Sequence, residues 1–194
     1  MIFADDVIPR HITCGMPLDY DTYFGADKFG NIFANRLPED TNEDVVNPTG
    51  NRILWDAGRM SGAPNKLDNV MNFHVGEAVT SCLKTKMSPT GDEVVVLGTI
   101  MGSVSAAMPF RSRDNVDFFS RLEMNMRNEK ISLVGRDQLS YRSYFVPVKC
   151  VVDGDLCEAY IHLPSDRQQY IADELNRTPG EIIKKLEEIR ARIL

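Results

Sequence analysis

The stretch DYDTYFGADKFGNIFANRL, residues 19–37, decides the fold of this chain. Residues 20–26 are rich in aromatic and small side chains, and residues 31–37 alternate in character. Between them, residues 27–30 form a break, and Gly30 can adopt the positive φ that a tight turn often needs. Two short runs around a glycine-containing turn predict a β-hairpin.

A second stretch of the same kind follows about seventy residues later. Residues 97–104 resemble residues 24–32 with one residue deleted. A hairpin that occurs twice suggests a repeated β unit, such as a propeller blade. Two unrelated hairpins with turn glycines are the alternative that periodicity leaves open. Further strands are predicted at residues 10–16, 70–75, 78–87 and 94–97.

The pattern changes from β to helical after residue 110. Residues 115–128 carry an apolar stripe, which predicts a helix capped by Asp114. Residues 139–152 are aromatic and β-branched, and Pro147 makes an edge strand or a strand end the expected structure. Residues 156–163 are compatible with either a helix or an extended chain.

Two capping boxes predict the last helices. Ser165 precedes Gln168 by three residues, and Thr178 precedes Glu181 by the same spacing. Pro179 then occupies a first helical position. The predicted fold is mainly β with an α-helical tail. Residues 1–110 are predicted to form β units, such as propeller blades, with a long loop at 38–69. Residues 111–194 are predicted to form a helix, a connecting segment and a C-terminal helical region.

The loop at 38–69 is rich in polar and turn-forming residues, so it is expected to be functional or disordered. It contains Trp55, the only tryptophan of the chain. Two roles for Trp55 stay open, namely pinning the loop onto the domain and contacting a partner.

Several unusual strings of the sequence resemble one protein family. They are DYDTYFGADKFGNI, FADD at 3–6, NPTGN at 47–51, NFHVGE at 72–77, GRDQLSYRSYFVPVK at 135–149 and DGDLCE at 153–158. They resemble the C-terminal part of the splicing factor 3b subunit 3 family. Its relatives are damage-specific DNA-binding protein 1 and the large cleavage and polyadenylation specificity factor subunit. The resemblance implies the last blades of a β-propeller, followed by a C-terminal helical domain. It is weakest in the loop at 38–69 and in the terminal helix.

The resemblance also implies a function and partners. It implies a nuclear, non-enzymatic scaffold in the spliceosomal complex that recognises the branch point. The expected partners are a HEAT-repeat large subunit, the small subunit 5 and a PHD-finger-like zinc subunit. By the same resemblance, residues 7–28 and 78–101 lie at the partner surface, and Lys149 faces the small subunit. A solvated lysine beside a strand is the alternative for Lys149.

Charge argues against direct contact with nucleic acid. The net charge is −6, and it falls on residues 1–110, which carry 14 acidic and 8 basic side chains. Nucleic-acid binding usually needs a basic footprint. A nucleic-acid-binding propeller module, by analogy with the DNA-damage relative, is the alternative function. The acidic character of residues 1–110 argues against it. Tight binding with a steep salt dependence would favour it.

The ionisable side chains do not form a catalytic or metal-binding pattern. His11, His74 and His162 are dispersed, and the four cysteines lack the close spacing of a zinc site. Asp153 and Asp155 share one turn, where aspartates commonly bind nearby backbone amides. We therefore predict no enzyme, no metal and no cofactor. A hydrolase that uses Asp153 or His74 is a third alternative.

Two predictions concern the chain as a whole. No run approaches 18 apolar residues, so no membrane span is expected. About two blades cannot close a propeller ring, and open blades expose unpaired strand edges. The isolated chain is therefore expected to be marginally stable or to associate with itself.

Overall fold

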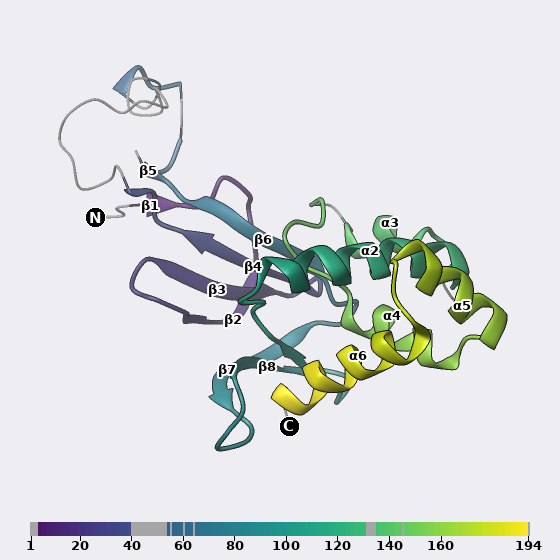
Figure 1. The fold of residues 1–194 in the computed structure, drawn as a ribbon. Coiled ribbons are helices and arrows are strands. Elements are labelled where there is room, and N and C mark those ends of the chain that lie inside the picture. The colour runs from purple at the N-terminus through teal and green to yellow at the C-terminus, as the bar shows by residue number, and fades with distance from the viewer. Residues whose placement is uncertain are drawn as a thin grey trace. The chain divides into compact units, whose positions relative to one another are not determined.

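The structure is a computed structural model that describes residues 4–39, 54, 56–59, 61–63, 65–130, 135–144 and 146–193. Strands are the main elements of the described chain up to Ala107, where Leu54 and Asp56 are helical, and the other helices follow from Arg113 (Figure 1). The expectation of a β region followed by helices is therefore confirmed. The chain divides into two compact units, and each is described by itself. Unit 1 comprises residues 1–82, 98–103 and 146–150, and unit 2 comprises residues 83–97, 104–145 and 151–194.

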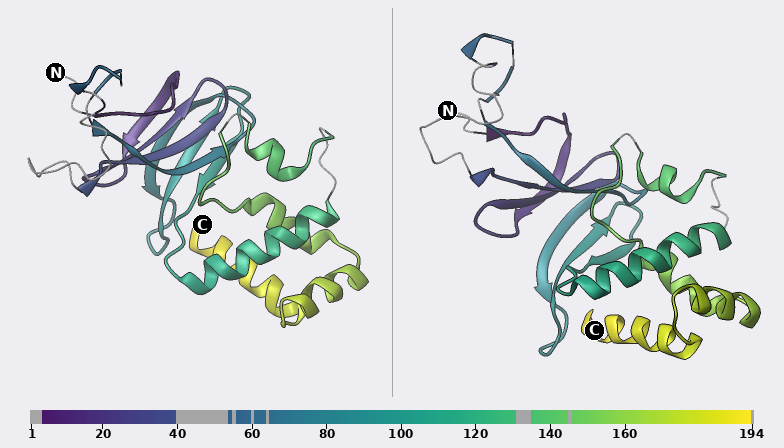
Figure 2. Two further views of the ribbon diagram at one scale, coloured as in Figure 1. Left: turned by 90° about the horizontal axis from the view of Figure 1, so that it is seen from above. Right: turned by 45° about the horizontal axis from the view of Figure 1, so that its top comes forward.

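The main sheet of unit 1 has the strand order β2-β3-β4-β6, with antiparallel neighbours. These strands are β2 (Ile12–Pro17), β3 (Thr22–Asp27), β4 (Asn31–Arg36) and β6 (Asp68–His74), and they lie side by side in Figure 2. The hairpin predicted at residues 19–37 is confirmed as β3 and β4. Gly30 has a φ of +84° at its turn, so the turn uses a conformation that favours glycine.

A second sheet has the order β7-β8-β9. Its strands are β7 (Val79–Lys86), β8 (Glu93–Thr99) and β9 (Val104–Ala107). The second predicted hairpin is confirmed as β8 and β9, and Gly102 has a φ of +89° at its turn. Both hairpins therefore place a left-handed glycine immediately before the returning strand or one residue away from it.

The helices of unit 2 enclose its core. They are α2 (Arg113–Glu129), α3 (Gln138–Arg142), α4 (Gly154–Glu158), the 3₁₀ turn η2 (Ala159–His162), α5 (Ser165–Glu174) and α6 (Pro179–Ile193). Buried core side chains come from α2, α4, η2, α5 and α6: Phe119, Leu122, Met126, Leu156, Tyr160, Ile171, Ile182 and Leu186. Within the described ranges, no helix is long and apolar enough to span a membrane.

Two expectations for residues 111–163 are corrected. The helix expected at 115–128 exists, but it begins at Arg113, and Ser112 occupies the N-cap position without a side-chain hydrogen bond. Asp114 therefore lies in the first turn instead of capping it. The strand expected within 139–152 is replaced by α3, whose N-cap Asp137 accepts a hydrogen bond from the Ser140 amide. Among the described residues of that stretch, one isolated bridge, at Lys149, remains.

The two predicted capping boxes have different outcomes. Thr178 and Glu181 exchange backbone-to-side-chain hydrogen bonds of 2.9 Å and 3.3 Å, so that box is confirmed. The box at Ser165 is wrong, because Pro164 is the N-cap of α5. The Gln168 amide donates instead to the carbonyls of Tyr160 and Ile161, each at 3.1 Å.

The loop at 38–69 lies largely outside the described residues, and so does Trp55, whose predicted roles therefore stay predictions. Its last part is not a loop. β5 (Asn65–Lys66) pairs in parallel with β1 (Ala4–Asp5), and β6 begins at Asp68. Asp5 anchors this end, because its carboxylate accepts hydrogen bonds from the Ala63 amide at 2.9 Å and from Lys66 Nζ at 2.5 Å.

Candidate partner-binding surface

Lys149 lies at the β6 edge of unit 1. Its amide donates to the Asn72 carbonyl at 3.0 Å, and its carbonyl accepts from the Asn72 amide at 3.2 Å. Its ammonium group donates to the Asn69 carbonyl. The side chain is exposed, and an ammonium group has three donors, so it can still bond a partner. Cys150 follows with a φ of +53°, which is rare for a residue other than glycine.

A buried guanidinium supports this edge, and it was not anticipated from the sequence. Arg10 Nη2 donates to Asn72 Oδ1 at 2.8 Å, and Arg10 Nε donates to Asp6 Oδ2 at 2.9 Å. The guanidinium also lies 4.0 Å from the centre of the Phe33 ring. Because the Arg10 side chain is only 2% exposed, this contact holds Asn72, and with it the pairing partner of Lys149. An arginine in an apparent strand gave no signal of this role.

The tips of the two hairpins meet at the turn that contains Glu77, within unit 1. The Val75 amide donates to the Gly30 carbonyl at 2.8 Å, on the side of the first hairpin. Glu77 Oε2 accepts hydrogen bonds from Thr99 Oγ1 at 2.5 Å and from Ser103 Oγ at 2.9 Å, on the side of the second. These two hydroxyl donors lower the pKa of Glu77 from its ordinary value of 4.5.

Large apolar side chains are exposed at both hairpin tips. Phe29 is 46% exposed, Ile100 is 69% exposed and Met101 is 77% exposed. Phe29 and Ile100 belong to turns that Glu77 and its neighbours hold in one place, and His11 packs edge-on against Phe29 at 6.0 Å. Clustered apolar side chains on a surface commonly mark a protein–protein contact. This surface therefore offers shape and apolar contact to a partner.

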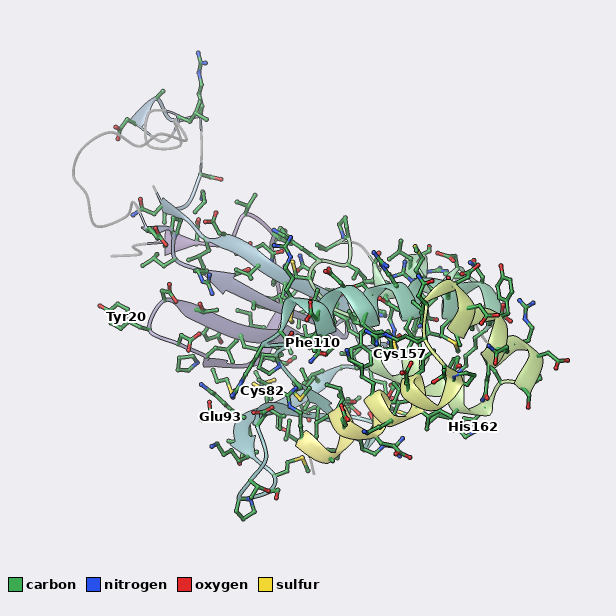
Figure 3. All side chains as sticks on the ribbon, viewed as in Figure 1. Tyr20, Cys82, Glu93, Phe110, Cys157 and His162 are labelled. Carbon is green, nitrogen blue, oxygen red and sulfur yellow. The ribbon has the colours of Figure 1, made fainter. Side chains whose placement is uncertain are left out.

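His74 and Asp153, the two residues weighed for catalysis, have structural partners. His74 is buried, and its Nδ1 lies 3.0 Å from Asn31 Oδ1. Asp153 is 3% exposed, caps α4 through the Leu156 amide, and accepts from Arg142 Nε at 2.7 Å. His162 is exposed in unit 2 (Figure 3). The expectation that Asp153 bonds nearby backbone amides is confirmed.

The described residues also lack a metal-binding arrangement. Among them, no group of three or more His, Cys, Asp or Glu side chains is placed to hold a metal ion. In unit 2, a depression of about 290 Å³ is lined by charged side chains of α2, the α5–α6 connection and α6, together with Phe118 and Leu175. It brings no cysteine, serine or histidine to its lining.

Comparison with known proteins gives a consistent result. Residues 1–162 match the model of the CPSF A subunit region. The chain is 54% identical to spliceosome-associated protein 130 A of Arabidopsis thaliana over 194 residues, covering 100% of the chain and 16% of that protein. It is 52% identical to the probable splicing factor 3B subunit 3 of Dictyostelium discoideum over 194 residues, covering 100% of the chain and 15% of that protein.

A vertebrate relative agrees. The chain is 50% identical to splicing factor 3B subunit 3 of Danio rerio over 193 residues, covering 99% of the chain and 16% of that protein. The chain thus spans about a sixth of the length of these relatives. Alignments at this level of identity cover nearly the whole chain, and the family model covers most of it. The chain therefore belongs to the family of splicing factor 3B subunit 3, which carries the CPSF A subunit region.

Proposed function

We propose that this chain is part of a non-catalytic scaffold subunit that acts in pre-mRNA splicing in the nucleus. The observation that carries the proposal is identity of 50–54% to relatives named for the spliceosome or for splicing factor 3B, over essentially the whole chain. The exposed apolar hairpin tips support a binding role. The internal hydrogen bonds of His74 and Asp153 support the absence of catalysis at these two residues.

Residues 1–110 are proposed to be the last blades of a β-propeller, and residues 111–194 the helical region that follows. A propeller blade is a four-stranded antiparallel sheet. The sheet β2-β3-β4-β6 has that number of strands and that direction. The sheet β7-β8-β9 begins a second unit of the same kind with three strands.

The proposed partners are the HEAT-repeat large subunit, the small subunit 5 and the PHD-finger-like zinc subunit of the splicing factor 3b complex. Segment 7–28 leads into the turn that contains the exposed Phe29, and segment 78–101 contains the exposed Ile100. This supports the place of both segments at a partner surface. Lys149 is proposed to bind the small subunit. Its backbone is paired with Asn72 and its ammonium group is held by the Asn69 carbonyl, so the side chain would lose little conformational entropy on binding.

The proposal is tested by reconstituting this chain with the small subunit and measuring affinity by titration. Lys149→Glu should weaken binding at least tenfold, because the new carboxylate would repel the acceptor group of the small subunit that the ammonium group contacts. Lys149→Met should weaken binding less, since it removes the charge but keeps the apolar stem. Lys184→Glu, at an exposed position of α6, is the matched charge-reversal control. An affinity of Lys149→Glu within twofold of the original chain would remove this residue from the interface.

A further inference from the structure

Two of the four cysteines lie together in unit 1. Cys14 belongs to β2, and Cys82, which is labelled in Figure 3, belongs to β7. Both thiols are free and half-buried. The other two cysteines differ from them. Cys150 is exposed, and Cys157 is buried in unit 2.

Hydrogen bonds bring β2 against β7 at this point. Thr13 Oγ1 donates to the Val79 carbonyl at 2.5 Å, and Cys14 Sγ donates to the same carbonyl at 3.9 Å. Cys82 lies three residues further along the strand that Val79 begins. The thiol of Cys14 therefore faces the strand that carries Cys82.

The surroundings of Cys82 and of Tyr23 place the two thiols beside each other. Burial, together with the neighbouring Cys14 side chain, raises the pKa of Cys82 to about 12. The pKa of Tyr23 is raised by burial and by the nearby Cys82 and Cys14, so this phenol lies near both thiols. Its hydroxyl lies over Gly15, where a side chain on Gly15 would occupy the same space. One phenol and two thiols thus share one location.

We propose that Cys14 and Cys82 form a peroxide-sensitive dithiol, which closes to a disulfide that joins β2 covalently to β7. The Cys14 sulfur attacks one oxygen of hydrogen peroxide, the O–O bond breaks, and a sulfenic acid and one water form. The Cys82 sulfur then attacks the sulfenic sulfur, and the departing hydroxide takes the Cys82 proton as a second water. Two thiols are oxidised to one disulfide, and one peroxide is reduced to two waters.

The order of the two steps follows from the surroundings of the thiols. The raised pKa of Cys82 keeps it protonated near neutral pH, and the thiolate is the reactive form. Cys82 is therefore the sulfur that resolves the intermediate, in the step that consumes its proton, which leaves the first step to Cys14. Cys157 offers no competing pair, because it is buried, it donates to the Phe119 carbonyl at 3.8 Å, and its pKa is raised by burial.

The test treats the folded 194-residue chain with an equimolar amount of hydrogen peroxide, blocks the remaining thiols by alkylation, and maps the peptides without reduction. The expected result is a linkage of Cys14 to Cys82 as the main product. For a chain without the native fold, we expect another product. Loop closure between residues 7 apart is favoured over closure between residues 68 apart by roughly 30-fold, so an unfolded chain would link Cys150 to Cys157.

Variants complete the test. Cys14→Ser should abolish the linkage and leave Cys82 available for alkylation, and Cys82→Ser should leave a sulfenic acid at Cys14 that a dimedone probe traps. Cys150→Ser, the matched control at an exposed cysteine, should leave the yield of the Cys14–Cys82 linkage unchanged. Dominance of a Cys150–Cys157 linkage would overturn the proposal, and so would quantitative alkylation of Cys14 and Cys82 after exposure to peroxide.

Discussion

Nε of Arg142 donates a hydrogen bond of 2.7 Å to Oδ2 of Asp153, and both side chains are largely buried. The same carboxylate oxygen accepts from Gln138 Nε2 at 2.7 Å, and the other oxygen caps α4. One aspartate therefore ties α3 to the start of α4 within unit 2. A catalytic carboxylate would need room for a substrate, and here every direction is occupied by the protein.

Replacing Asp153 should be strongly destabilising. Asp153→Ala removes the cap of α4 and leaves the Arg142 guanidinium, whose side chain is 15% exposed, without its carboxylate. Removing one partner of a buried ion pair costs about 3–5 kcal/mol of unfolding free energy. The measurement is urea unfolding followed by circular dichroism.

Asp155→Ala is the matched control for that experiment. Asp155 stands two residues away, in the first turn of α4, and it is exposed. Its replacement should change the unfolding free energy by no more than about 0.5 kcal/mol. Equal effects at the two aspartates would contradict the structural role of Asp153.

The two turn glycines should respond differently to alanine, although their φ angles are similar. At Gly102 a side chain would meet nothing within 4 Å, so Gly102→Ala should cost only the left-handed strain of about 1–2 kcal/mol. At Gly30 a Cβ would lie 2.8 Å from the Glu77 carbonyl oxygen, so Gly30→Ala adds a clash with backbone. We expect Gly30→Ala to lower the unfolding free energy by at least twice as much. Thermal and urea unfolding of the two variants decide this, and similar losses would contradict the close approach at Gly30.

Local chemistry explains which features the sequence predicts well. The hairpin at 19–37 depends on alternation and on Gly30, and the start of α6 depends on Thr178 and Glu181, all within a few residues. The bridge between Asn72 and Lys149 joins residues that are distant in the chain. Arg10 reaches Asn72 across 62 positions. No short pattern carries such pairings, because they arise only when the sheet is assembled.

The wrong capping box at Ser165 has the same kind of cause. Its spacing to Gln168 is the one that the motif requires, yet the 3₁₀ turn before α5 presents the carbonyls of Tyr160 and Ile161 to the Gln168 amide. Gln168 therefore satisfies the preceding turn instead of the helix start. Tyr160 returns the contact, since its hydroxyl donates to the Gln168 carbonyl at 2.8 Å.

This difference predicts unequal effects of two similar substitutions. Thr178→Ala removes a hydroxyl that accepts from the Glu181 amide, and loss of such a cap costs about 1 kcal/mol. Ser165→Ala removes an exposed hydroxyl that does not occupy the cap position of α5, so its cost should stay within about 0.5 kcal/mol. Urea unfolding of both variants tests this, and a larger loss for Ser165→Ala would restore the capping box at α5.

Glu77 should make the stability of unit 1 sensitive to acid. Its pKa is lowered below the ordinary value of 4.5 by hydrogen bonds from Thr99 and Ser103. A carboxylate whose pKa is lower in the folded than in the unfolded chain stabilises the fold at pH values above its unfolded pKa. That contribution is lost as the pH falls through the folded pKa. The acid form cannot accept both hydroxyl donors as well as the carboxylate does.

Glu77→Gln should therefore be less stable than the original chain at neutral pH, and the difference should shrink as the pH falls below the ordinary value of 4.5. Urea unfolding at pH 7 and at several lower values measures it. Thr99→Val removes the first-named donor while keeping the shape of the side chain, so it should flatten the same pH dependence. Because both substitutions break the same hydrogen bond, the double variant should lose less unfolding free energy than the two single losses combined. A difference between Glu77→Gln and the original chain that stays constant down to about pH 2 would show that this carboxylate does not hold the second hairpin tip.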